Sequence, residues 1–387
     1  MVWRRYLLIC LGAALAVVCA GAVVNYVVDV RQIYVGSGGA SYYDRYAQQL
    51  VQSKYGLVGN SFPRPIKLRL AELSDADCYV TGSSREMQID IETMPALGKV
   101  CRKVTNLAVS RGAFEDLVAA AGMVAANPHA RRLFIGVQSW GFRRAADDGW
   151  SEEPDAYLRA RAMFHLKAEP NAHAGASAKL QNLINGEYLL RNLEAVWDSG
   201  IGHSPFPPIV AIGPDGQAPR DKDEIFCPDG RLQYSRSAVA KIPMPVAAVG
   251  EGSYKLSPTV PAFDPAVAAE YSRIAEALNE RGIVTEYILM PFHPKIWECA
   301  KPFVCTTLTT VERDLRSLAQ QQGAKVLGSF DPRKLGLDWR SFMDDMHLAQ
   351  QEQYKVPVEL AQAKPVAAPP AQTELDLHAR YKTCASP

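Results

Sequence analysis

The residues that decide the fold run from Asp77 to Arg85 and read Asp-Cys-Tyr-Val-Thr-Gly-Ser-Ser-Arg. The apolar run Asp77–Thr81 predicts a short buried strand, and Gly82 ends it. We expect a helix to follow, so that Ser84 lies on a strand-to-helix turn at the carboxyl edge of a sheet. Active sites gather at this edge.

Further short apolar runs alternate with helical patterns along the chain. They lie at 104–109, 133–137, 284–290 and 325–327. This alternation is typical of a parallel sheet covered by helices, and it predicts an α/β fold.

Two of the intervening helices carry clear end signals. Asp264 is an N-cap residue, Pro265 fits the first helical position, and Gly282 ends the pattern. Thr307–Gln322 repeats the helical spacing, with Gly323 as its stop. A strand is expected directly after each helix.

The alternation fails between about 142 and 250, which we interpret as an insertion that contains an amphipathic helix at Ala176–Val196 and loops rich in Pro and Gly. A polar and aromatic helix at 40–57 is expected to act as a spacer. The predicted organisation is a stub and anchor at 1–30, a linker at 31–70, an α/β domain at 71–353 and a Pro/Ala-rich tail at 354–387.

The N-terminal segment Tyr6–Val28 contains no charged residue and would be roughly 34 Å long as a helix, which is enough to cross a bilayer. Arg4 and Arg5 precede it, so the positive-inside rule places the N-terminus in the cytoplasm and the main domain outside. The alternative is a signal peptide cleaved near Ala20-Gly21-Ala22. With either an anchor or a cleaved signal peptide, the chain that follows this segment is exported from the cytoplasm.

Composition narrows the class of partner and the redox compartment. The net charge of +1 gives no electrostatic reason to expect nucleic acid as a partner. Six cysteines lie outside the anchor, which permits disulfides in an oxidising compartment; Cys299 and Cys305, which flank a short loop, are the expected local pair. No CxxC or nearby His supports a zinc site, and no cofactor is expected.

Two motifs could carry chemistry. Ser84 follows the first strand, and Asp344 precedes His347 by three residues. An Asp at this spacing can orient the imidazole and stabilise its protonated form, which gives the serine a base. Each motif alone also fits a structural role, as a turn serine or as a surface Asp beside a capping His.

Together, in this order, the two motifs resemble the SGNH (GDSL-like) hydrolase superfamily over roughly 76–353. The resemblance implies a flavodoxin-like parallel sheet sandwiched by helices, with Ser84 as nucleophile, His347 as general base and Asp344 as its orienting partner. Ser83 stands where the family usually has Asp.

Further segments look like a bacterial cell-envelope subgroup of this superfamily. They are Asn106–Ser110, Ile135–Trp140, Asp229–Tyr234, Leu289–Pro294 and Gly328–Pro332. Related proteins include periplasmic alginate O-acetyltransferases and the teichoic-acid D-alanylation protein. The resemblance implies a single-pass protein of the inner membrane, with its main domain in the periplasm, that transfers or removes acyl groups on a polysaccharide.

The chain departs from the family where the oxyanion donors lie. The family's third block has Gly-x-Asn-Asp, whereas this chain has Gly136-Val-Gln138-Ser, so Gln138 is the candidate replacement for the missing Asn. Asn106 is a second candidate, and backbone N–H groups could also serve. Loss of one such donor costs about 10² to 10³ in rate.

Two further residues could contact substrate. Arg85 could bind a sugar hydroxyl or a carboxylate, or pair with Glu86 or Asp90. His293 could contact substrate or act as a second base, or bond a backbone carbonyl at the end of its strand.

The sequence leaves two functions open. The first is a membrane-anchored serine acyltransferase or esterase acting on O-acyl groups, chiefly acetyl, of an envelope or exported polysaccharide. An integral-membrane protein could then supply the acyl donor. The second is a non-catalytic protein of the same fold that binds glycan or an assembly partner.

Overall fold

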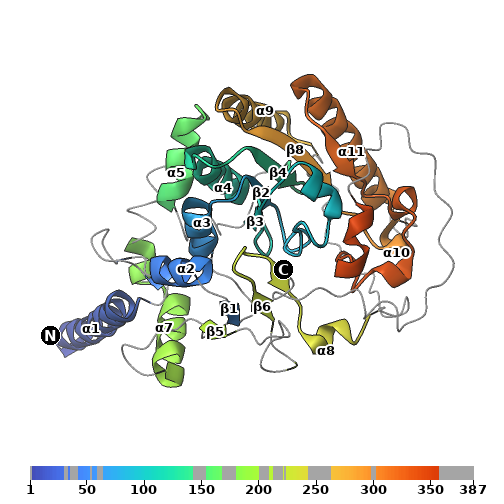
Figure 1. Ribbon diagram of the computed structural model, residues 1–387. Helices are drawn as coiled ribbons and strands as arrows, with labels where there is room; N and C mark the ends of the chain where they lie inside the picture. The colour runs from blue at the N-terminus through green and yellow to red at the C-terminus, as the bar shows by residue number, and fades with distance from the viewer. Residues whose placement is uncertain are drawn as a thin grey trace.

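A computed structural model gives the fold of most of the chain (Figure 1). It describes residues 2–29, 34, 42–52, 55–58, 64–142, 154–167, 180–199, 209–211, 221, 224–242, 263–297 and 302–356.

Five parallel strands form the central sheet, in the order β3-β2-β4-β8-β9. Their bounds are β2 Cys78–Thr81, β3 Val104–Asn106, β4 Arg132–Gly136, β8 Val284–Leu289 and β9 Val326–Gly328. Numbered along the chain, this order is 2-1-3-4-5, the order of flavodoxin-like sheets. All five predicted strands are confirmed, with ends that differ by up to three residues.

The two faces of the sheet are covered differently. Side chains alternate between faces along a strand, so Tyr79 and Leu133 enter one hydrophobic cluster while Val80 and Phe134 enter another. α-Helices cover the first face: α3 Arg64–Leu73, α4 Phe114–Ala126, α9 Pro265–Glu280 and α11 Pro302–Gln322, and α5 Pro154–Met163 packs against α4. The second face lies under the 3-10 helices η1 (Pro95–Lys99) and η4 (Pro332–Leu335) and part of the segment 337–356. Helices were expected on both faces of the sheet. α-Helices cover the first face, whereas 3-10 helices and part of the segment 337–356 cover the second.

The end signals of α9 act as predicted. The Asp264 side chain accepts a hydrogen bond from the Ala266 N–H at 2.8 Å, and Gly282 adopts a left-handed φ of 75° after the last turn. Helix α11 begins at Pro302, five residues before the predicted start, so the sequence expected as a loop between Cys299 and Cys305 is largely helical. Cys299 lies outside the described residues.

A second, antiparallel sheet joins the linker to the insertion, which the sequence analysis did not predict. Its order is β5-β1-β6-β7, with β1 Tyr55–Val58, β5 Ile209–Ala211, β6 Ile225–Phe226 and β7 Leu232–Gln233. The spacer helix predicted at 40–57 is shorter, since α2 spans Tyr42–Gln52 and strand β1 follows it. Helix α2 packs against α3 and buries Tyr43, Ala47 and Leu50, so it belongs to the body of the protein.

The amphipathic helix predicted at 176–196 is interrupted at Asn185. The Asn185 side chain accepts hydrogen bonds from the N–H groups of Glu187 and Tyr188 and so caps a new helix, α7, at Gly186–Ser199. The remaining short helices are α8 (Arg236–Val239) and α10 (Pro294–Trp297). Much of the insertion and the predicted tail beyond 356 lie outside the described residues.

Helix α1 (Val2–Val28) is the predicted apolar segment. Its stretch Trp3–Val28 is long and apolar enough to cross a membrane. In Figure 1 it lies at the edge of the molecule, next to α7.

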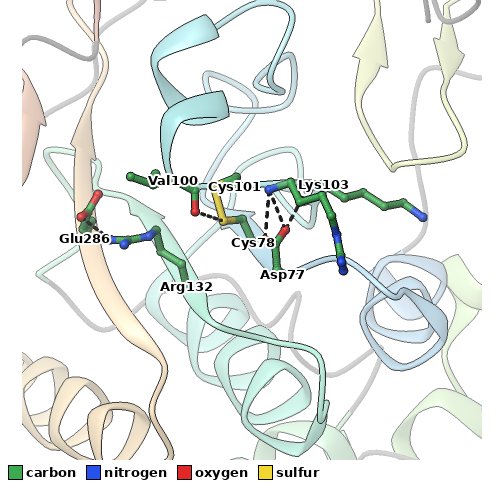
Figure 2. The surroundings of a disulfide bond; sticks show 8 residues. Asp77, Cys78, Val100, Cys101, Lys103, Arg132 and Glu286 are labelled. Atoms are coloured by element: carbon green, nitrogen blue, oxygen red, sulfur yellow. Dashed lines mark hydrogen bonds and ion pairs between the residues drawn. A yellow bond between two sulfur atoms is a disulfide. The ribbon is translucent and has the colours of Figure 1, made fainter.

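A disulfide joins Cys78, the first residue of β2, to Cys101 (Figure 2). Beside it, the Asp77 carboxylate accepts hydrogen bonds from the backbone N–H groups of Arg102 and Lys103, which holds the returning chain at the start of β3. Cys227 is also disulfide-bonded, to a partner whose side chain lies outside the described part. The sequence predicted disulfides but did not assign this pair. Disulfides are typical of an oxidising compartment.

Replacing Cys78 and Cys101 together by Ala should lower the free energy of unfolding by about 3 kcal/mol, because the bond closes a loop with a sequence separation of 23. Urea unfolding of the body would measure the loss. The matched control replaces Cys10 and Cys19 in α1, which are both free, and should leave stability unchanged. A loss no larger than that of the control would contradict the assigned role.

Candidate active site

Ser84 lies in a turn directly after β2, at the carboxyl edge of the parallel sheet and between the ends of β3 and β4. The helix predicted to follow the serines does not form, since residues 84–88 are turns. The reason is that buried polar side chains form hydrogen bonds with backbone groups of this segment that an α-helix would pair with one another.

Glu86 is the first of these side chains. It folds back into the protein, where its Oε2 accepts hydrogen bonds from the Ser83 N–H at 2.7 Å and the Ser83 hydroxyl at 3.2 Å. The Gln138 amide donates to both carboxylate oxygens at 2.8 Å. Gly82 and Gly136 make room for it, because a Cβ at either position would lie 2.6 or 2.3 Å from a Glu86 atom. Glu86 therefore supports the turn that carries Ser84 from inside.

Asn106 supports the same turn from the end of β3. Its Nδ2 donates to the carbonyl oxygens of Glu86 at 2.8 Å and Ile89 at 3.0 Å, and its Oδ1 accepts from the Ala108 N–H. In an α-helix those carbonyls would bond N–H groups four residues later. The amides of both oxyanion candidates, Asn106 and Gln138, thus hold the turn that carries Ser84.

Ser84, His347 and Asp344 form one continuous hydrogen-bonded chain. The His347 Nε2 lies 2.8 Å from the Ser84 Oγ, and the His347 Nδ1 lies 2.6 Å from the Asp344 Oδ2. Ser84 and the imidazole are both partly exposed to solvent. The structure brings the three predicted residues together across 263 positions of sequence.

Asp344 is held as a carboxylate. Partial burial acts to raise its pKa, but the hydrogen bond and charge of His347 and the N–H groups of Met346 and His347 hold the pKa of Asp344 below its usual value. An ionised Asp344 fixes the imidazole so that Nδ1 carries its proton and Nε2 faces the serine.

Arg85 is buried and connects the serine turn to the histidine loop. Its Nε donates to the Met346 carbonyl at 3.0 Å, and its terminal nitrogens donate to the Pro291 carbonyl at 2.7 Å, the Met290 carbonyl and the Gln138 Oε1 at 3.1 Å. The guanidinium lies 3.7 Å from the centroid of the Phe292 ring. The hydrogen-bond acceptors of Arg85 are thus mainly backbone carbonyls. Of the carboxylates considered for Arg85 from sequence, Glu86 feels its charge, which acts to lower the pKa of Glu86 against the effect of burial.

His293 lies behind the triad and is fully buried. Its Nδ1 accepts a hydrogen bond from the Lys295 N–H, and its ring meets Phe342 edge-on at 5.4 Å. Burial and the charge of Lys295 lower the pKa of His293, with Asp344 opposing the shift. His293 is thus a neutral side chain within the wall of the site.

The insertion contributes to the site through the β6–β7 hairpin. The Leu232 N–H donates to the Met87 carbonyl at 2.7 Å, and Arg231 forms a buried ion pair with Asp90 at 2.6 Å. Both contacts fall on the segment that follows Ser84, so the insertion helps to fix the turn that carries Ser84. The Asp229–Tyr234 segment noted in the sequence contains the turn of this hairpin and strand β7.

Glu224 is a site residue that the sequence analysis missed. It immediately precedes β6 and is half-buried, within electrostatic reach of His347. Burial raises the pKa of the Glu224 carboxyl, while the charge of His347 opposes the rise. No motif distinguishes it from the other acidic residues, because only the folding of the insertion brings it to the triad.

A scan against models of known protein families and a search of curated proteins find no match to this chain. Among the described residues, no group of three or more His, Cys, Asp or Glu side chains could hold a metal ion.

Replacing Arg85 by Met should lower the free energy of unfolding at pH 7 by about 3 to 5 kcal/mol, because it leaves buried carbonyls unpaired and removes the charge that offsets buried Glu86. Without that charge the pKa of Glu86 rises further above its usual value. Protonation of Glu86 in the folded state then favours folding, so the difference from wild type should narrow as the pH falls.

Chemical denaturation at pH 7 and at pH 5 would measure both effects. The control is Arg102→Met, which removes an exposed arginine and should change stability by no more than about 0.5 kcal/mol. Equal effects of the two substitutions would contradict the role given to Arg85.

Proposed function

We propose that the protein is a membrane-anchored serine O-acyltransferase or esterase of the SGNH (GDSL-like) type. Its substrates would be O-acyl groups, chiefly acetyl, on an envelope or exported polysaccharide. The observation that carries the proposal is the chain from Ser84 through His347 to Asp344, with distances of 2.8 and 2.6 Å. Nucleophile, base and orienting carboxylate are within hydrogen-bond reach of one another, as acyl transfer requires.

The reaction would proceed in two steps. The Ser84 Oγ attacks the carbonyl carbon of the acyl donor while His347 Nε2 takes the hydroxyl proton, and that proton then passes to the leaving oxygen. The resulting acyl-enzyme is attacked by a sugar hydroxyl or by water, whose proton passes through His347 back to Ser84. Asp344 stays ionised and stabilises the imidazolium that forms in each step.

The carbonyl oxygen of the acyl group gains negative charge during the attack, and hydrogen-bond donors must stabilise that charge. The amides of Asn106 and Gln138 are engaged with the nucleophile turn. We assign the role to backbone, beginning with the Ser84 N–H, for which no hydrogen bond occurs within the described residues. Backbone donors suit this role because they are fixed before the reaction begins.

The anchor supports a polymer-modifying role. With α1 across the bacterial inner membrane and its N-terminus in the cytoplasm, the α/β domain would lie in the periplasm, consistent with its disulfide. There it would meet polysaccharide chains during export and acyl groups delivered by an integral-membrane protein.

A non-catalytic glycan-binding or assembly protein is the second candidate. The observation that favours it is the engagement of the Asn106 and Gln138 amides, which leaves the site without a side-chain amide donor for the oxyanion. The two candidates differ in whether Ser84 reacts.

Replacing Ser84 by Ala should reduce polysaccharide acylation in cells, or ester hydrolysis by the purified protein, by at least about 10³-fold, because the nucleophile is lost. Thermal unfolding should stay near that of wild type. The control is Ser110→Ala, an exposed serine, which should leave both activities intact. Unchanged activity in the Ser84 variant would favour the non-catalytic candidate.

Replacing Glu224 by Gln should move the acidic limb of the pH–rate profile to lower pH. Above its raised pKa, Glu224 is ionised and places a negative charge within electrostatic reach of His347, the base of the proposed reaction. A neutral Gln removes this charge, which attracts protons to the site. Because Glu224 is half-exposed, we expect a shift of less than about one pH unit. Values of kcat/KM for a small ester across pH would measure it, and a shift in the opposite direction would contradict the placement of Glu224.

A further inference from the structure

The outer end of α1 is held by the insertion through polar contacts. The buried Asn25 side chain donates to the carbonyl oxygens of Asn182, Leu183 and Asn185 at 3.0 to 3.2 Å. On the same helix face, Asp29 accepts a hydrogen bond from the Tyr188 hydroxyl at 2.7 Å. The contact between α1 and α7 is therefore specific.

Asn192 of α7 completes this contact by donating to the Asn25 Oδ1 at 3.0 Å. Gly21, one turn earlier in α1, leaves room for Leu189, whose side chain would lie 3.1 Å from a Cβ at that position. Polar groups and close packing thus fix α7 to the last two turns of α1.

This contact sets the depth of α7 if α1 spans a bilayer. The uncharged part of α1 from Tyr6 to Val24 is about 28 Å long at 1.5 Å per residue, which already comes close to the thickness of the hydrocarbon core. The polar residues Asn25 and Asp29 then lie at the outer boundary of the membrane. Helix α7, which binds these residues, lies at the same level.

At that level α7 presents an apolar face that no part of the described protein covers. Leu190, Leu193 and Trp197 recur at helical spacing, with exposed fractions of 61, 46 and 90%. Leu180 and Ile184, just before the helix, are 64 and 62% exposed.

Negative charge borders one edge of this apolar face. Glu187 and Glu194 are exposed there, three residues before and four residues after Leu190, and their charge would not attract anionic headgroups. A helix whose apolar face has a charged edge and carries an exposed Trp suits the boundary between headgroups and acyl chains.

We propose that residues 180–199 form an interfacial membrane-binding element beside α1, with Leu190, Leu193 and Trp197 in contact with lipid. The inference depends on the membrane span within the proposed function and is independent of the serine chemistry. It gives the α/β domain two attachments to the bilayer. The domain would therefore hold a fixed orientation above the lipid instead of swinging on a single tether.

Lipid-quenched Trp fluorescence of the full-length protein in phosphatidylcholine vesicles tests this directly. The emission of Trp197 is obtained by subtracting the emission spectrum of the Trp197→Phe variant from that of the wild type. Bromine at carbons 6 and 7 of the acyl chains should quench it about twofold or more, as expected for side chains 5 to 10 Å into the boundary region. Bromine deeper in the chain should quench it less, and addition of anionic lipid should not alter the result.

Two matched variants complete the design. Subtracting the Trp3→Phe spectrum isolates the emission of Trp3, which reports insertion of α1 into the bilayer. Subtracting the Trp297→Phe spectrum isolates the emission of Trp297 in α10. This helix lies across the molecule from α1 in Figure 1, so bromine on the lipid should not quench it. Quenching of Trp3 without quenching of Trp197 would overturn the inference and leave the anchor intact. Trp197 shielded from both lipid and aqueous quencher would also overturn it, because α7 would then pack on protein. No quenching of Trp3 would instead refute the membrane span, and the inference with it.

Discussion

The buried guanidinium of Arg85 is the contact on which the candidate site depends. Arg85 is the chain neighbour of Ser84, and the Met346 carbonyl that it binds is the chain neighbour of His347. Its other donors bind Gln138 and the chain directly after β8, so one side chain joins the segments that follow three strands of the sheet. Arginine suits this position because its planar fork has five donors and its face can stack on Phe292.

The side chains that support the turn of Ser84 are polar. Glu86, Gln138 and Asn106 hold the turn through buried hydrogen bonds to backbone and to one another. Such networks are rigid when every member is satisfied. The amides of Asn106 and Gln138 hold Ser84 in place, so in the proposed reaction the stabilisation of charge would rely on backbone N–H groups. Helix α7 would extend the same ordering to the whole domain by fixing its orientation at the membrane.

The sequence predicted the parts of the fold that depend on local pattern. The strand positions, the Asp264 cap and the approach of Ser84 to the Asp344–His347 motif follow from apolar runs, capping chemistry and the order of motifs. The sequence did not predict features that depend on distant partners. The turn after Ser84 replaces a helix because Asn106 and Gln138 arrive from other strands, and β1 forms only because the insertion supplies β5 and β6. The roles of Arg85 and Glu224 were missed for the same reason.

In the proposed function, the fold activates Ser84 through His347. A fluorophosphonate probe reacts with an activated serine, and mass spectrometry of the labelled, full-length protein identifies the residue. We expect one label, on Ser84, that forms at least about 10³-fold more slowly in His347→Ala and is absent from the unfolded chain. Labelling of Ser84 at the same rate in wild type and His347→Ala, or no labelling of the folded protein, would contradict it.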